Sequence, residues 1–154
     1  MSMSTTNAMS SILEAMTVLA LLLVSIAHPS VAQSSDAADA PVSVSDGVFT
    51  ATQAEHGEQV FAAACQGCHQ PEQFTGPGFI DAWSGQTADA PFDVIRKTMP
   101  EDNPSSLKRS DYAAVLAYLF HLNGLPTGET DLPSLARKLK QIRIESVSET
   151  REKP

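Results

Sequence analysis

The most regular pattern of apolar and polar positions lies late in the chain, between residues 111 and 122. Its apolar residues recur one and four positions apart, so a helix would gather them on one face: Val115, Leu116, Leu119 and Phe120. Ser106 or Ser110 can cap the start of this helix. Asn123-Gly124 and then Pro126 end the pattern. The pattern predicts a helix over 111–122 whose apolar face is wide enough to cover a core.

A second helix is predicted further upstream, from a cap at Thr50 or Thr52 to about Ala64. Glu55 stands three residues after Thr52 and would complete a capping box. This helix ends immediately before the first of the two cysteines in the chain.

Gly57 stands out within the second helix, because glycine lowers helix stability by about 1 kcal/mol relative to alanine. Gly57, Phe61 and Cys65 are spaced four residues apart and share one helix face. We interpret Gly57 as the position where another helix crosses closely; the alternative is a glycine that the helix merely tolerates. Tyr118 and Leu119 are the candidates for packing on this face.

The segment between these two helices is rich in Gly and Pro. Gln70–Gly85 cannot form one helix, and Gly76-Pro77-Gly78 marks a turn. Pro91 suits the first position of a helix, which predicts a short helix over 91–97. No strand-rich pattern is visible, so the chain is predicted to be all-α, with about three to four helices.

The N-terminal residues have features of an export signal. Met16–Ala27 is a run of twelve mostly apolar residues, shorter than the roughly 20 that span a bilayer. Ser30-Val31-Ala32 offers small residues to a signal peptidase, so we predict a signal peptide over 1–32 and cleavage before Gln33. Residues 1–15 carry no Lys or Arg, so a later start codon or an uncleaved interfacial anchor is the alternative.

Two further segments flank the predicted domain, which spans residues 48–128. Residues 33–47 are mainly Ser, Ala, Asp and Pro and predict a flexible linker, with order beginning near Val48. Residues 129–154 form a C-terminal extension that we expect to be partly helical with a loose end. Its apolar residues could wrap back over the domain: Leu132, Leu135, Leu139, Ile142 and Ile144.

Composition limits the choice of partners. The chain has 154 residues and a formal net charge of −8. About 120 residues are left after signal removal, enough for one domain. The acidic balance argues against binding to nucleic acid or to an anionic membrane surface. A charged docking partner should therefore present a basic surface.

The candidate chemistry lies at Cys65-Gln66-Gly67-Cys68-His69, which reads C-x-x-C-H and is the attachment signature of a c-type haem. Thiols three positions apart can bond the two vinyl groups on one edge of a porphyrin. The adjacent imidazole of His69 can then reach the iron from one face. Because haem attachment in bacteria takes place outside the cytoplasm, the motif also favours export.

Three other uses of the two cysteines are open. A thioredoxin-like redox pair expects a βαβ context, which the pattern lacks. A zinc site needs a second pair of ligands, and Cys65 and Cys68 are the only cysteines. A plain disulfide is the third. The adjacent His69 and the export signal favour haem attachment over all three.

Met99 is the candidate for the sixth iron ligand. The other four methionines lie within residues 1–16, so Met99 alone is left after signal removal. Pro100 ends the preceding helix and sets Met99 on a loop. His/Met ligation raises the reduction potential and closes the iron to small molecules. His56, His121 and an open sixth position are the alternatives.

Two more residues are predicted to surround the haem. A haem-ligating His usually donates its second ring N–H to a carbonyl, and we expect that carbonyl in the Pro77 region. Trp83 is the only tryptophan. It either packs in the core or donates its indole N–H to a haem propionate.

Together these residues resemble class I cytochromes c. The shared pattern covers about residues 48–128 and reads G-x-x-x-F-x-x-x-C-x-x-C-H, Gly-Pro, Trp, Met-Pro and D-Y-x-x-V-L-A-Y-L. More narrowly, D-G-V-F-T-x-x-Q, T-M-P and S-L-x-x-S-D-Y-A-A-V-L-A-Y-L-x-x-x-N-G-L-P-x-G look like the small cytochromes found beside, or fused to, bacterial quinoprotein (PQQ) dehydrogenases. The resemblance implies a cytochrome c fold around one haem c. It also implies that Cys65 and Cys68 carry this haem and that His69 and Met99 are its axial ligands.

These observations predict a periplasmic one-electron carrier. Its expected partners are a redox protein donor, for which a quinoprotein dehydrogenase is a candidate, and a respiratory acceptor. We expect no membrane contact after signal cleavage. An enzyme is not predicted, because no nucleophile and base stand in a recognisable order. The alternatives are a haem-based sensor or peroxidase-like protein with an open sixth position, and a non-haem dithiol module.

Overall fold

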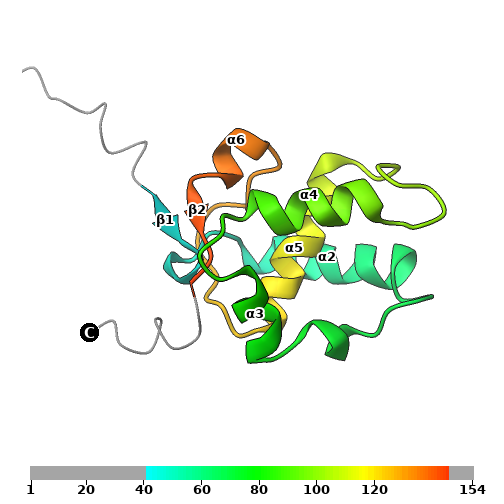
Figure 1. The fold of residues 1–154 in the computed structure, drawn as a ribbon, viewed down its shortest axis with the longest axis horizontal. Coiled ribbons are helices and arrows are strands. Elements are labelled where there is room, and N and C mark those ends of the chain that lie inside the picture. Colours follow the sequence, from blue (N-terminus) through cyan, green and yellow to red (C-terminus); the bar gives the residue numbers. More distant parts are fainter. Residues whose placement is uncertain (1–40, 146–154) are drawn as a thin grey trace, which may run out of the picture. The chain divides into compact units, whose positions relative to one another are not determined.

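The structure is a computed structural model and describes residues 41–145. Along the chain its elements are (Figure 1) β1 (Val42–Ser43), η1 (Val44–Asp46), α2 (Ala51–Ala64), η2 (Pro71–Phe74), α3 (Pro77–Trp83), α4 (Asp89–Thr98), α5 (Arg109–Leu122), α6 (Ala136–Leu139) and β2 (Ile142–Arg143). The predicted signal peptide, residues 33–40 of the predicted linker and residues 146–154 of the tail lie outside the described residues. Within residues 41–145 the fold is mainly helical, as predicted, with five α-helices in place of three to four. None of these helices is both long enough and apolar enough to cross a bilayer.

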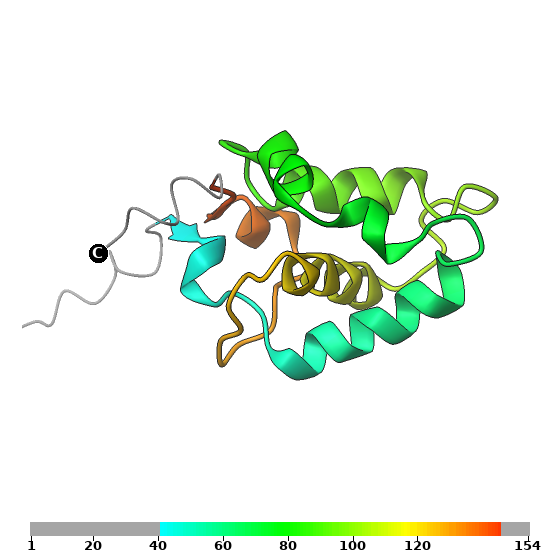
Figure 2. The same cartoon turned by 90° about the horizontal axis from the view of Figure 1, so that it is seen from below.

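Helix α5 is the central element of the described fold. It lies between α2 and α4 in Figure 2 and packs on both. Every residue of α5 from Tyr112 to Phe120 is buried. The predicted apolar stripe was therefore too narrow, because other elements cover α5 on more than one face.

The contact between α2 and α5 depends on Gly57. A Cβ placed there would lie 1.9 Å from the carbonyl oxygen of Ala114 and 3.0 Å from the Cβ of Tyr118. The two helix backbones are therefore in contact, which confirms the predicted crossing. The ring of Tyr118 also packs against Phe61 at a centroid distance of 5.6 Å, and Leu119 joins the same buried cluster.

The first turn of α2 resolves the choice between two predicted caps. Thr50 is the N-cap, and its hydroxyl accepts a hydrogen bond from the Gln53 amide at 3.0 Å. The alternative cap at Thr52, with Glu55 completing a capping box, is wrong. The predicted end of the helix at Ala64 is confirmed.

Two other helices begin earlier than predicted. Helix α5 follows Lys108, whose side chain makes no capping bond, so neither Ser106 nor Ser110 is its cap. Helix α4 begins at Asp89, which puts Pro91 third in the helix instead of first. Proline is tolerated there because the first four amides of a helix have no helical acceptor.

Helix α3 was not predicted. The turn expected at Gly76-Pro77-Gly78 is the start of this helix, with Gly76 as N-cap at φ +88° and Pro77 at the first helical position. Proline at that position is a helix-start signal, but the flanking glycines masked it. The helix packs Phe79 and Trp83 against the core.

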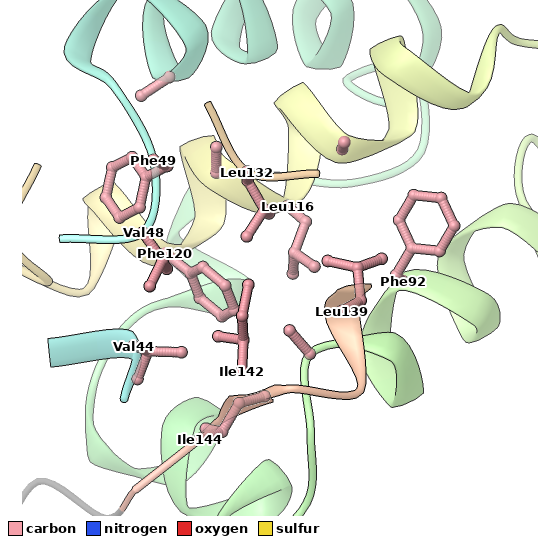
Figure 3. Close-up of a cluster of buried hydrophobic side chains, with 14 of the residues drawn as sticks. Val44, Val48, Phe49, Phe92, Leu116, Phe120, Leu132, Leu139, Ile142 and Ile144 are labelled. Atoms are coloured by element: carbon pink, nitrogen blue, oxygen red, sulfur yellow. The ribbon is translucent and has the colours of Figure 1, made fainter. Parts of the chain in front are cut away.

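Both ends of the described chain enter one apolar core (Figure 3). Its fully buried side chains come from segments far apart in sequence and include Val44, Phe49, Phe92, Phe120, Leu132, Leu139 and Ile144. Val44 belongs to the segment predicted to be a flexible linker, yet its side chain is 0% exposed. The prediction that order begins near Val48 is therefore wrong, because the side chain of Val44 is already buried in the core.

The C-terminal extension wraps back over the domain, as predicted. Strand β2 pairs in parallel with β1, which joins Val42 to Ile142 and Ser43 to Arg143. Leu135 is exposed, whereas the other predicted apolar residues are buried: Leu132, Leu139, Ile142 and Ile144. The folded part therefore extends beyond the predicted 48–128 at both ends.

Candidate functional site

The C-x-x-C-H motif forms a tight turn where α2 ends. Cys65 is the C-cap of α2, and its amide donates to the Phe61 carbonyl at 2.8 Å. The Cys65 carbonyl accepts hydrogen bonds from the amides of Cys68, at 3.1 Å, and His69, at 2.9 Å. These bonds hold Cys65, Cys68 and His69 in one turn directly after the helix.

Two cavities lie beside this turn. The larger, of about 460 Å³, is lined by Ala64, Cys65, Gly67, Cys68, His69, Met99, Pro100, Glu101 and Asp102. The smaller, of about 160 Å³, is lined mostly by apolar side chains: Phe61, Cys65, His69, Phe74, Phe79, Trp83, Pro91, Val94, Ile95, Thr98, Met99, Val115 and Leu119. Cys65, His69 and Met99 line both cavities, and Cys68 lines the larger. The structure therefore gathers around one space all four residues predicted to hold the haem.

Aromatic rings form one wall of the smaller cavity. The Phe74 ring centroid lies 5.5 Å from that of His69 and 5.9 Å from those of Phe61 and Phe79. All three pairs meet edge to face, the geometry that aromatic quadrupoles favour. Sequence reasoning missed Phe74 and Phe79, which lie in the segment assigned to a turn. The sequence signal that could have identified them is the presence of two large aromatic residues in a segment rich in Gly and Pro.

Met99 lies where α4 ends. It is the C-cap of α4, and its amide donates to the Ile95 carbonyl at 2.9 Å. Its own carbonyl accepts a hydrogen bond from the hydroxyl of Tyr112 in α5 at 2.8 Å. The prediction that Met99 lies on a loop directly after a helix is confirmed.

The two thiols differ in exposure. Cys65 is half-buried and Cys68 is exposed, and both are free thiols rather than halves of a disulfide. Burial raises the pKa of the Cys65 thiol. Among residues 41–145, no three His, Cys, Asp or Glu side chains are placed to hold a metal ion by themselves.

The other two residues predicted to surround the haem are placed differently. Trp83 is partly buried and lines the smaller cavity. Pro77 is exposed at the start of α3 and lines neither of the two cavities. The carbonyl bond from this region to the His69 ring stays a prediction.

The two histidines considered as alternative ligands lie elsewhere. His56 is on the surface of α2 and pairs with Asp111 at 3.1 Å. His121 is exposed and packs against the ring of Phe49 at a centroid distance of 6.4 Å. Neither histidine lines the two cavities.

Comparison with known families supports the interpretation of this site as a haem-attachment site. Residues 52–119 match the model of the family described as cytochrome C oxidase, cbb3-type, subunit III. Neither the comparison with curated proteins nor that with solved structures gives a match. The matched segment runs from α2 into α5 and contains every residue that lines the two cavities.

The fold and the match over residues 52–119 together support a cytochrome c domain. The fold is the cytochrome c fold, and the cofactor is covalently bound haem c. This supports the resemblance to class I cytochromes c, whereas the narrower link to quinoprotein dehydrogenases stays a prediction. The site fits the cofactor, since two thiols, an imidazole and a thioether meet beside an apolar cavity suited to a porphyrin face.

Proposed function

We propose that the protein is a periplasmic mono-haem c-type cytochrome that carries one electron at a time. Cys65 and Cys68 attach the haem, and His69 and Met99 are the two axial ligands. When bound, the haem supplies an iron that changes between the ferrous and ferric states. The observation that carries the proposal is the position of Met99, which lines both cavities together with Cys65 and His69.

The protein's own side chains tune and protect the iron in this proposal. An imidazole and a thioether close both axial positions to small molecules, and the thioether raises the reduction potential. The apolar lining of the smaller cavity keeps water away, so little solvent rearranges when the charge changes. With both axial positions occupied, no place is left at the iron for a substrate. We therefore propose a carrier rather than an enzyme.

The rim of the larger cavity suggests the charge of the partner. Glu101 and Asp102 line this cavity beside Cys68 and are exposed. Opposite charges across an interface speed the encounter of redox proteins. We therefore propose that the partners dock a basic surface here.

The pathway proposed is transfer from a dehydrogenase to a respiratory acceptor. A quinoprotein dehydrogenase is the candidate donor, from the sequence resemblance. The matched family is named for an oxidase subunit, which supports a respiratory acceptor.

The proposal also includes export of the protein with cleavage of a signal peptide. The mature protein should begin near Gln33, and retention of Met1–Ala32 would favour an interfacial anchor instead.

Replacing Met99 by Ala tests the axial ligation. The wild-type haem should be six-coordinate and bind carbon monoxide and cyanide poorly. Met99→Ala should lose the charge-transfer band between thioether and ferric iron, lower the reduction potential and bind carbon monoxide rapidly. His121→Ala is the matched control, because His121 is exposed away from both cavities and its loss should leave the spectrum unchanged.

Two results would contradict the proposal. An unchanged spectrum and potential in Met99→Ala would show that Met99 is not a ligand. Rapid binding of carbon monoxide by the wild-type protein would show an open sixth position. The sensor or peroxidase-like alternative would then replace the carrier.

A further inference from the structure

One buried hydroxyl connects the two ends of the loop that carries Met99. This loop, the Met99 loop, comprises residues 99–108 between α4 and α5. Tyr112 in α5 is 1% exposed. Its hydroxyl donates to the Met99 carbonyl at 2.8 Å and accepts a hydrogen bond from the Leu107 amide at 3.4 Å. A single oxygen atom therefore joins the first residue of the loop to a residue near its end.

The backbone around Met99 offers its carbonyl few other hydrogen-bond donors. The carbonyl lies beyond the last turn of α4, where helical donors end. Pro100, the next residue, has no amide hydrogen to give. The loop is also held to α4 by the Ser105 hydroxyl, which donates to the Arg96 carbonyl at 3.0 Å, but that bond is exposed to water. Of these two hydroxyls that hold the loop, that of Tyr112 belongs to a buried side chain.

Helix α5 also carries the contact with α2. Ala114, two residues after Tyr112, is in backbone contact with Gly57 of α2. Helix α2 leads directly into the turn that holds Cys65 and His69. Tyr112 therefore lies on the helix that connects the Met99 side of the cavities to the His69 side.

We infer that Tyr112 is a positioning residue for Met99: its hydroxyl holds the Met99 loop against α5 and so keeps the thioether at the iron. This inference rests on the proposed function, in which Met99 is an axial ligand. The hydrogen bond breaks when the loop moves away from α5. Its free energy therefore opposes detachment of Met99.

Imidazole binding to the oxidised, haem-loaded protein tests the inference. Imidazole can take the sixth position only when Met99 is detached, so its apparent Kd is inversely proportional to the detached fraction. Tyr112→Phe removes the hydroxyl and keeps the ring. We expect imidazole to bind roughly five- to tenfold more tightly to this variant. The thioether charge-transfer band should also become more sensitive to heat.

Tyr118→Phe is the matched control. Tyr118 is a second buried tyrosine of α5, 6% exposed. Its ring packs against Phe61, whereas the hydrogen bonds to the Met99 loop are made by Tyr112. This variant should bind imidazole as the wild-type protein does.

The possible failures can be told apart. A wild-type protein without the thioether band would overturn the proposed function itself. If that band is present, equal imidazole affinity in wild type, Tyr112→Phe and Tyr118→Phe would overturn the inference alone. So would a loss of unfolding free energy in Tyr112→Phe with no change in imidazole affinity, since that marks a purely structural role.

A second measurement applies if Tyr112→Phe does not fold. Hydrogen exchange of the Leu107 amide can be followed in the wild-type protein, because that amide donates to the Tyr112 hydroxyl. Slow exchange supports the inference. Exchange at the rate of an unstructured peptide overturns it.

Discussion

Gly57 in α2 and Ala114 in α5 are in direct backbone contact, with only 1.9 Å between the carbonyl oxygen of Ala114 and the position that a Cβ of residue 57 would take. Helix α2 ends in the turn that holds His69, and α5 carries Tyr112, whose hydroxyl binds the Met99 carbonyl. The crossing of these two helices therefore connects the two sides of the site. Small changes at their crossing should affect both stability and the haem.

Gly57→Ala should lower the free energy of unfolding by about 1 to 2 kcal/mol. The added methyl group must push two backbones apart, and this cost exceeds the gain in helix propensity of about 1 kcal/mol. Denaturant unfolding of the haem-loaded protein measures the change. Gly78→Ala in α3 is the control, because a Cβ there meets nothing within 4 Å. Similar effects of the two substitutions would contradict the close contact.

Val44→Ala should lower the free energy of unfolding by about 2 kcal/mol, since it removes two methyl groups from a fully buried site. Val42→Ala, two residues earlier, should have almost no effect because Val42 is 41% exposed. Thermal or denaturant unfolding of both variants gives the comparison. If Val44→Ala is as stable as Val42→Ala, the segment before Val48 does not belong to the folded domain.

Asp93→Asn should reduce stability at neutral pH by less than about 1 kcal/mol, because Asp93 and its partner Lys97 are partly exposed. A hydrogen bond from Lys97 at 2.7 Å, helped by the charges of Lys97 and Arg96, lowers the pKa of Asp93. The unfolded chain therefore takes up this proton more readily than the folded protein. The stabilisation is present above the ordinary Asp pKa of about 3.9 and is lost as the pH falls through the lowered pKa.

The difference between wild type and Asp93→Asn should accordingly shrink in acid, and also in high salt, which screens exposed charges. Unfolding curves measured across pH give this difference directly. A difference that grows as the pH falls would contradict the sign of the shift.

Trp83→Phe should move the pH dependence of the reduction potential to higher pH. We propose that the Trp83 indole N–H donates to a haem propionate, and losing a donor to a carboxylate raises the pKa of that carboxylate. The phenyl ring keeps most of the apolar contact that Trp83 makes along the smaller cavity. Potentiometric titration at several pH values measures the change. An unchanged pH profile would mean that Trp83 serves only as packing.

The part of the site that could be read from the sequence is the local part. Cys65, Cys68 and His69 lie within one turn, so their spacing alone places them together. Met99 could be found by elimination, because only one methionine lies outside the first sixteen residues. Gly57 indicated a helix crossing, because a glycine inside a helix lowers the stability of that helix.

The rest depends on contacts between distant segments. The pairing of β1 with β2 joins residues 42–43 to 142–143, and strands of two residues carry no periodic signal. Val44 was assigned to a linker because its sequence neighbours are polar. Its burial is explained by apolar residues from the C-terminal extension, which lie in the same core cluster. The hydroxyl of Tyr112 likewise binds a loop that sequence pattern alone does not place beside it.

The central claim is that a haem is bonded to the polypeptide through Cys65 and Cys68. Acid–acetone treatment of protein produced with haem-attachment factors, followed by mass spectrometry of the cysteine-containing peptide, tests it most directly. The colour should stay with the protein, and this peptide should carry the mass of one haem. Colour that is extracted into the acetone, or a colourless protein despite those factors, would contradict it.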